Sequence, residues 1–186
     1  MIPIFACAAN ASITDLAGLV IRNINRFVTR DFYIGQIKHV KSLSYHSLAG
    51  QKLSGDENFY LALADDADEK AFSLIADHFS GDKQNDTTDI FDAVCEFINV
   101  SNGLFASELS EKEKELELEP VFAYQDQTIE GDFHILPVYI EDHRINLVIA
   151  DNDQVKLGDT PYHFASNEKQ VYDIPTDSCL LYTSPS

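Results

Sequence analysis

Apolar residues recur at two different spacings along the chain, and each spacing predicts one kind of element. In residues 14–29 and 69–79 they fall every three or four positions, which is the period of an amphipathic helix. Ser12 or Thr14 can cap the first of these helices, because a short hydroxyl side chain accepts a hydrogen bond from a free backbone amide. Two helices, each with one apolar face, are therefore expected.

A third and longer helical pattern covers residues 88–109. Asp86, followed by Asp89 three positions later, offers an acidic start that suits the positive end of a helix. The residues expected on its core face are Ile90, Val94, Phe97, Ile98, Leu104 and Phe105. Cys95 borders that face and is interpreted as a small packed side chain.

Strands are indicated where β-branched and aromatic residues dominate, or where apolar and polar residues alternate. The clearest hairpin joins residues 133–140 to residues 145–150 through the polar turn at 141–144. Alternation in KELELEP predicts an edge strand that includes Leu116 and Leu118. Further strands are expected at 32–45, 58–64 and 170–174.

The order of these elements predicts the fold class. Helix, strands, two helices and strands together indicate an α+β domain, in the broad sense an α/β protein, with a mainly antiparallel sheet covered by helices. A single domain is expected over residues 11–177, because a chain of 186 residues that is 45% hydrophobic can bury a substantial core.

Charge excludes some classes of partner. The formal net charge is −18 and the pI is about 4.4, which disfavours binding to phosphate backbones or anionic lipid surfaces. We therefore expect no nucleic-acid and no membrane partner. No apolar run approaches the roughly 20 residues that span a bilayer, and a basic signal segment is missing, so the chain is predicted to be cytoplasmic.

The ends of the chain are interpreted separately. The sequence of residues 179–186, CLLYTSPS, resembles the translation of a sequencing adapter, so residues 178–186 are expected to be a non-native tail and residues 1–10 the lead-in of a fragment. Cys7, Cys95 and Cys179 have neither disulfide nor metal-type spacing, and the histidines are scattered singly. No metal site or cofactor is predicted.

One polar stripe stands out on the third helix. At about 100° per residue, Asp92, Glu96, Asn99 and Gly103 lie within roughly 60° of one another. Asn102 adds a further weak helix former beside Asn99 and Gly103, although a helix interior disfavours such residues. Chance polar residues on a solvated face remain the alternative to a functional site. Asn23 and Asn25 in the first helix are predicted to face solvent.

The stripe suggests a particular chemistry. A carboxylate and a neutral amide one turn apart make a poor acid/base pair, but the carboxylate of Glu96 can bind a cation on a partner, and the amide of Asn99 can both donate to and accept from water. This combination suits hydrolysis of an activated phosphoryl group, where alignment of the attacking water is the main requirement.

The segment DAVCEFIN, with Asp92, Glu96 and Asn99, resembles the D/S-x3-E-x2-N signature of the CheC/CheX family of chemotaxis phosphatases. In that family the signature continues through a spacer to a proline, which Pro120 matches after a slightly shorter spacer. Residues 92–110, ELELEP and FHILPVYIEDHRINLVIA also resemble CheX-like domains, and the resemblance covers residues 11–150. It implies a CheX/CheC-like fold and a homodimer.

The resemblance also implies a function and a role for each residue. The substrate would be the aspartyl phosphate of a CheY-type response regulator, with Asn99 orienting water and Glu96 pairing with the regulator's active-site lysine. Asp92 would support the helix, Gly103 would admit another backbone, and Pro120 would support the site. The Mg²⁺ would belong to the regulator's receiver domain. The first helix lacks the E-x2-N spacing, so one site per chain is expected. A non-catalytic CheX-like module that binds a receiver or partner domain is the alternative.

Overall fold

Helices and strands follow one another largely as the apolar pattern predicts. The computed structural model describes residues 11–66, 69–83 and 86–162, so the segments 1–10, 170–174 and 178–186 lie outside the described residues. The elements are α1 (Ala11–Asn23), η2 (Ile24–Val28), β1 (Phe32–Ile34), β2 (Lys38–Gly55), β3 (Phe59–Asp65), α2 (Lys70–Ser80), α3 (Thr87–Glu111), β4 (Leu116–Leu118), β5 (Phe122–Ile140) and β6 (His143–Ala150).

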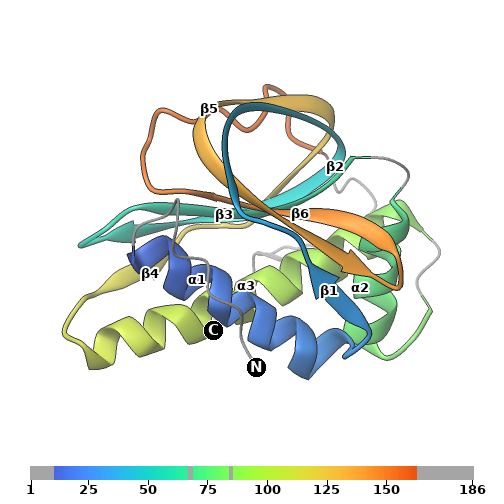
Figure 1. Cartoon of the computed structure of the whole chain (residues 1–186), viewed down its shortest axis with the longest axis horizontal. Coiled ribbons are helices and arrows are strands. Elements are labelled where there is room, and N and C mark those ends of the chain that lie inside the picture. Colours follow the sequence, from blue (N-terminus) through green and yellow to red (C-terminus); the bar gives the residue numbers. More distant parts are fainter. Residues whose placement is uncertain (1–10, 67–68, 84–85, 163–186) are drawn as a thin grey trace, which may run out of the picture.

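The strands form one antiparallel sheet in the order β1-β5-β6-β3-β2-β4. Strand β2 also pairs with β5, in a register that runs from Lys38↔Ile135 to Gly50↔Phe122. Strands β2, β3, β6 and β5 therefore close into a ring, and Figure 1 shows the long strands β2 and β5 curling above the helices. The expected antiparallel sheet, with its edge strand β4 and its β5–β6 hairpin, is confirmed.

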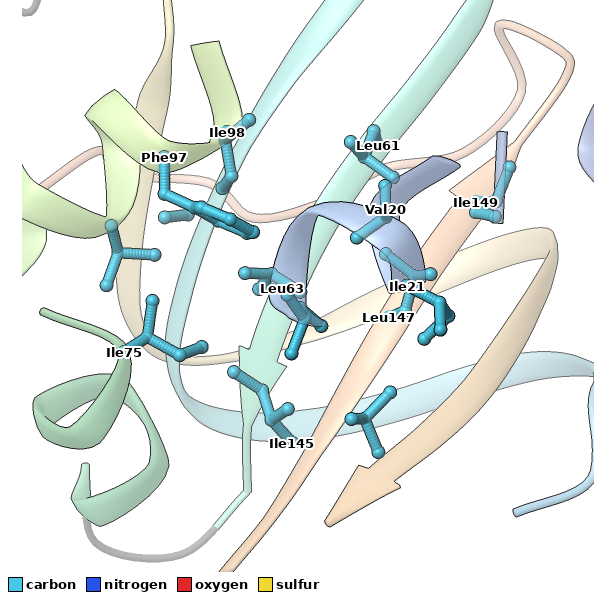
Figure 2. Packing of buried hydrophobic residues seen from close by; sticks show 14 of the residues in the cluster. Val20, Ile21, Leu61, Leu63, Ile75, Phe97, Ile98, Ile145, Leu147 and Ile149 are labelled. Atoms are coloured by element: carbon cyan, nitrogen blue, oxygen red, sulfur yellow. The ribbon is translucent and has the colours of Figure 1, made fainter. Parts of the chain in front are cut away.

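Two hydrophobic clusters fill the space on the two faces of this sheet. The helix-side cluster joins the sheet to α1, α2 and α3, and the inner cluster lies within the curl of β2 and β5. Alternation along β3 divides its residues between them, since Leu61 and Leu63 belong to the helix-side cluster and Ala62 and Ala64 to the inner cluster. Figure 2 shows part of the helix-side cluster: Val20, Ile21, Leu61, Leu63, Ile75, Phe97, Ile98, Ile145, Leu147 and Ile149.

Helix α3 runs the length of the helical layer. Asp86 occupies the N-cap position as expected, although its side chain makes no capping hydrogen bond. The core face is confirmed for five of its six predicted members, Ile90, Val94, Phe97, Ile98 and Phe105, which are all buried. Neither α3 nor any other helix in the described ranges is long and apolar enough to cross a membrane.

The predicted start of the first helix is wrong. Helix α1 already includes Ala11, so Ser12 and Thr14 lie within it, where the backbone is helical and cannot form an N-cap. The helix continues as the π-helical turn η2, after which the Thr29 amide donates to the Ile24 carbonyl oxygen at 2.9 Å.

The single strand expected over residues 32–45 is interrupted. Strand β1 pairs with the end of β5 and β2 resumes along the same partner, with the break lying opposite Pro137. The Gly35 amide donates to the Pro137 carbonyl oxygen at 2.8 Å, but proline has no N–H to return the bond on that side. Strand β2 then extends to Gly55, beyond the predicted end, because β3, β5 and, at its last residues, β4 pair with it there.

Candidate functional site

The residues of the predicted stripe share one side of α3 but differ in exposure. Glu96 is exposed, whereas Asp92 and Asn99 are half-buried. Gly103 is partly exposed, and a Cβ placed on it would meet no atom of the described residues within 4 Å, apart from its own helix. The stripe therefore faces outward at Glu96 and Gly103, while the Asn99 side chain lies at the border between solvent and core.

Asn99 is tied to the sheet by a buried glutamine. Gln51 lies on β2, facing α3, and is only 2% exposed. Its Nε2 donates to Asn99 Oδ1 at 2.9 Å and to the backbone carbonyl oxygen of Glu119 at 2.7 Å. Its Oε1 accepts from Nδ2 of Asn102 at 2.9 Å. Asn99 and Asn102, one turn apart on α3, thus both form hydrogen bonds with the side-chain amide of Gln51 on β2.

The same contacts bring Pro120 close to Asn99. Pro120 is exposed, and it directly follows Glu119, whose carbonyl oxygen accepts from Gln51. The Glu119 amide donates to the Lys52 carbonyl oxygen at 2.9 Å, which holds this segment against β2. Two residues that the sequence analysis named separately, Asn99 and Pro120, are therefore connected through Gln51.

Gln51 was missed because residues 46–55 were not predicted as a strand. One signal was present in the sequence, since Ala49, Gln51 and Leu53 alternate with the period of a strand. Ala49 and Leu53 are both fully buried in the helix-side cluster, and the position between them carries an amide. A polar residue in an apolar row indicates a buried group that needs partners.

Four other side chains of the helices can be compared with expectation. Cys95 is fully buried, as predicted for a packed side chain. Leu104 was predicted on the core face but is 36% exposed, because it lies about 80° around the helix from Glu96, at the border of the apolar arc. Asn23 was predicted to face solvent but is 3% exposed, because it lies three, four and seven positions after Val20, Leu19 and Leu16, on the buried face of α1. Asn25 is exposed as expected.

A large cleft lies elsewhere, between α1, η2, β1 and the C-terminal half of α3. Its volume is about 990 Å³, and neither Glu96 nor Asn99 lines it. Arg22 of α1, Arg26 of η2 and Arg30, just after η2, border it, and Arg22 forms an ion pair with Glu108 at 3.4 Å. In the described parts of the chain, no group of three or more His, Cys, Asp or Glu side chains is arranged to hold a metal ion.

The fold and this arrangement define a class of protein. It is an α+β domain in which helices cover one face of a six-stranded antiparallel sheet, and one of those helices presents a carboxylate and an amide one turn apart. No protein-family model matches the chain, and no curated protein matches it in sequence.

Solved structures identify the fold more closely as that of CheX and CheC-like chemotaxis proteins. The chain is similar to chemotaxis protein CheX from Desulfovibrio desulfuricans, with 14% identity, a TM-score of 0.65 and coverage of 77% of this chain and 100% of the other. It is also similar to a CheC-like superfamily protein from Shewanella sp. PV-4, with 17% identity, a TM-score of 0.63 and coverage of 76% and 97%.

A third similar structure contains a partner protein. It is the complex of CheX with CheY, BeF3 and Mg from Borrelia burgdorferi, with 13% identity, a TM-score of 0.56 and coverage of 74% of this chain and 95% of the other. At these identities the likeness establishes the fold of this chain, and the residues of its site must be argued from their own geometry.

Proposed function

We propose that this protein is a CheX-like phosphatase that accelerates hydrolysis of the aspartyl phosphate of a CheY-type response regulator. The observation that carries the proposal is the pairing of exposed Glu96 with half-buried Asn99 on one side of α3, in a protein with the CheX-like fold. A similar CheX has been solved in complex with CheY, which supports a response-regulator receiver domain as the partner.

The two side chains suit different parts of this reaction. Glu96 is an exposed carboxylate that can pair with a cationic side chain at the regulator's phosphorylation site. Asn99 is held at one end by Gln51, so its amide enters the complex with little freedom left to lose. Asp92, one turn before Glu96, would support this part of α3, and open space above Gly103 would admit the partner's backbone.

The chemistry needs little from this chain beyond alignment. Water attacks phosphorus in line with the bond to the aspartyl oxygen, that bond breaks, and the aspartate leaves as a carboxylate. The attacking water supplies the hydroxyl of inorganic phosphate and gives its second proton to a phosphoryl oxygen or to solvent. The Mg²⁺ that neutralises charge belongs to the regulator in this proposal. The proposal also includes a cytoplasmic location and the homodimer that the family resemblance implies.

Substitution of Asn99 tests this function most directly. For Asn99→Ala, we expect the accelerated decay of a phosphorylated CheY-type receiver to fall by about 10²-fold or more, because the water loses its positioning group. The free energy of unfolding should fall by only about 1 kcal/mol, since Gln51 keeps its bond to Glu119. Release of inorganic phosphate, with catalytic amounts of this chain, measures the first quantity, and denaturant unfolding measures the second.

Asn25→Ala is the matched control, because Asn25 is an exposed asparagine on a neighbouring helical segment. Its rate should equal that of the unmodified chain. An Asn99→Ala variant with a normal rate would contradict the proposal. If the unmodified chain binds the phosphorylated receiver without shortening the lifetime of its phosphate, the non-catalytic binding module is the correct function.

A further inference from the structure

We propose that Gln51 is a positioning residue that determines which end of the Asn99 amide faces outward, and that Pro120 acts on the site by directing the Glu119 carbonyl towards Gln51. This inference rests on the proposed phosphatase function, but Gln51, Asn102 and Glu119, through which it acts, lie outside the signature that contains Asn99 and Pro120. Each step follows from which atoms can donate a hydrogen bond and which can only accept one.

The orientation of Gln51 is decided by the backbone. A carbonyl oxygen has no hydrogen to donate, so the Gln51 atom that lies 2.7 Å from the Glu119 carbonyl oxygen must be the amide nitrogen. The opposite end, Oε1, then accepts from Asn102 at 2.9 Å. Reversing the Gln51 amide would place its oxygen against the Glu119 carbonyl and its nitrogen against the Asn102 amide. Because Gln51 is 2% exposed, water cannot replace the lost bonds.

The orientation of Asn99 follows from that of Gln51. The amide nitrogen of Gln51 has two hydrogens, of which one bonds to Glu119 and the other to Asn99 at 2.9 Å. The Asn99 atom that accepts must be Oδ1. Its Nδ2 makes no hydrogen bond with the described residues and is not among their buried unpartnered atoms, so it is left to the solvent side.

This orientation suits the proposed reaction. An outward N–H group donates to an electron-rich oxygen, either that of the attacking water or one on the phosphoryl group. The reversed amide would present its oxygen to phosphoryl oxygens, which repel it. The second lone pair of Oδ1 remains available to accept from the same water. The buried network therefore selects the end of Asn99 that a phosphoryl group can approach.

Pro120 fixes the first group in this chain of hydrogen bonds, the carbonyl of Glu119 that accepts from Gln51. The residue before a proline is restricted to extended conformations, because the proline ring clashes with its backbone in the helical region. Glu119 is such a residue, and its amide is already bound to Lys52 on β2. Its carbonyl direction is thus constrained on both sides. Pro120 itself is exposed, so its influence on Asn99 passes through Glu119 and Gln51.

The test compares two substitutions of Gln51 with a matched control. Gln51→Met keeps the length of the side chain but removes both donors, and Gln51→Glu replaces the donor by acceptors. In both variants we expect kcat for receiver dephosphorylation to fall by about tenfold or more, with KM for the receiver unchanged within about twofold. Gln127→Met is the control, since Gln127 also bridges backbone groups, at Asp159 and Thr160, but none of its side-chain hydrogen bonds reaches Asn99 or α3, and its kcat should not change.

A second measurement does not depend on activity. In NMR spectra of the unmodified chain, side-chain amide protons of Gln51 and Asn102 should exchange slowly with water and those of Asn99 quickly. In Gln51→Glu, one Asn99 amide proton should become protected, because Asn99 reverses to donate inward. Fast exchange of Asn99 in both proteins, or slow exchange in the unmodified chain, would overturn the inference even if the chain proves to have no phosphatase activity.

Pro120→Ala keeps the inference testable if the Gln51 variants fail to fold, because Pro120 is exposed. It should lower kcat several-fold without changing KM or the thermal unfolding midpoint. An unchanged kcat in a folded Pro120→Ala variant would show that Pro120 does not act on Asn99 through Glu119 and Gln51. A raised KM with an unchanged kcat in the folded Gln51 variants would show that Gln51 serves docking of the receiver and not positioning of Asn99.

Discussion

Two of the buried polar side chains on strand β2, Tyr45 and Gln51, form hydrogen bonds with different destinations. Tyr45 packs in the inner cluster, is 5% exposed, and donates through its hydroxyl to the Leu157 carbonyl oxygen at 2.6 Å. Gln51 lies against α3, and its hydrogen bonds lead to Asn99, which reaches the surface. The Tyr45 bond ends on backbone and closes a hydrophobic cluster. The Gln51 bonds end on a side chain that a partner can touch.

The difference separates a polar group whose hydrogen bond ends on the backbone from one whose hydrogen bonds reach an accessible side chain. Both groups are satisfied, so neither stands out as a defect. What separates them is the second partner, since Tyr45 binds only a backbone carbonyl while Gln51 transmits an orientation to an accessible amide. The cleft of about 990 Å³ does not separate them, because neither Asn99 nor Tyr45 lines it. If this comparison is correct, changes on the Gln51 side affect turnover and changes on the Tyr45 side affect stability.

The largest effect in the comparison is expected at Glu96. For Glu96→Ala, KM for the phosphorylated receiver should rise by about tenfold or more, because the variant loses the charge that pairs with the partner. Glu108→Ala is the control on the same helix, as Glu108 is an exposed glutamate paired with Arg22. Steady-state phosphate release over a range of receiver concentrations measures both. Equal KM values for the two variants would contradict the docking role of Glu96.

A smaller effect, on stability alone, is expected at Tyr45. Tyr45→Phe removes the donor to the Leu157 carbonyl and should lower the free energy of unfolding by about 1 to 3 kcal/mol, because the buried acceptor loses its bond. The kcat value should not change. Tyr33→Phe is the control, since Tyr33 is 56% exposed and its unfolding free energy should change by less than about 0.5 kcal/mol. Denaturant unfolding measures both free energies. A loss of turnover in a folded Tyr45→Phe variant would contradict the expectation that Tyr45 affects stability alone.

The smallest effect should appear only in alkali. Burial, followed by the nearby Tyr124 and Asp159, raises the pKa of the Tyr45 hydroxyl. The unfolded chain loses this proton near pH 10 while the folded chain retains it, so stability is complete below that pH and falls as pH rises above it. Unfolding measured from pH 8 to 11 should show this decline, and Tyr45→Phe should reduce its slope. Burial also raises the pKa of Tyr124, so part of the slope should remain.

Local sequence patterns predicted most helices and strands correctly, but they failed at particular residues. Alternation placed Phe59, Leu61 and Leu63 on one side of β3, and helical spacing buried Ile90, Val94 and Phe97, as observed. The break at Gly35 was not predictable locally, because its cause is Pro137 on a different strand. Leu104 was misplaced because a helical projection defines an arc but not which neighbouring element covers its border.

The candidate site divides in the same way. The spacing of Glu96 and Asn99 was enough to predict that they project from one side of a helix, since helical periodicity alone sets that angle. Gln51 lies 48 positions before Asn99 and 68 positions before Glu119, and no local pattern relates them. Only pairing of β2 with its neighbouring strands, and packing of α3 on β2, bring them together.

By itself, then, the sequence determined which residues face the core in most elements and that Glu96 and Asn99 lie on one side of α3, because both depend on periodicity within one element. The tertiary structure decided that β2 and β5 close the sheet into a ring. It also decided that a buried glutamine connects Asn99 with the segment before Pro120. Those features depend on hydrogen bonds between distant positions, whose partners exist only once the chain has folded.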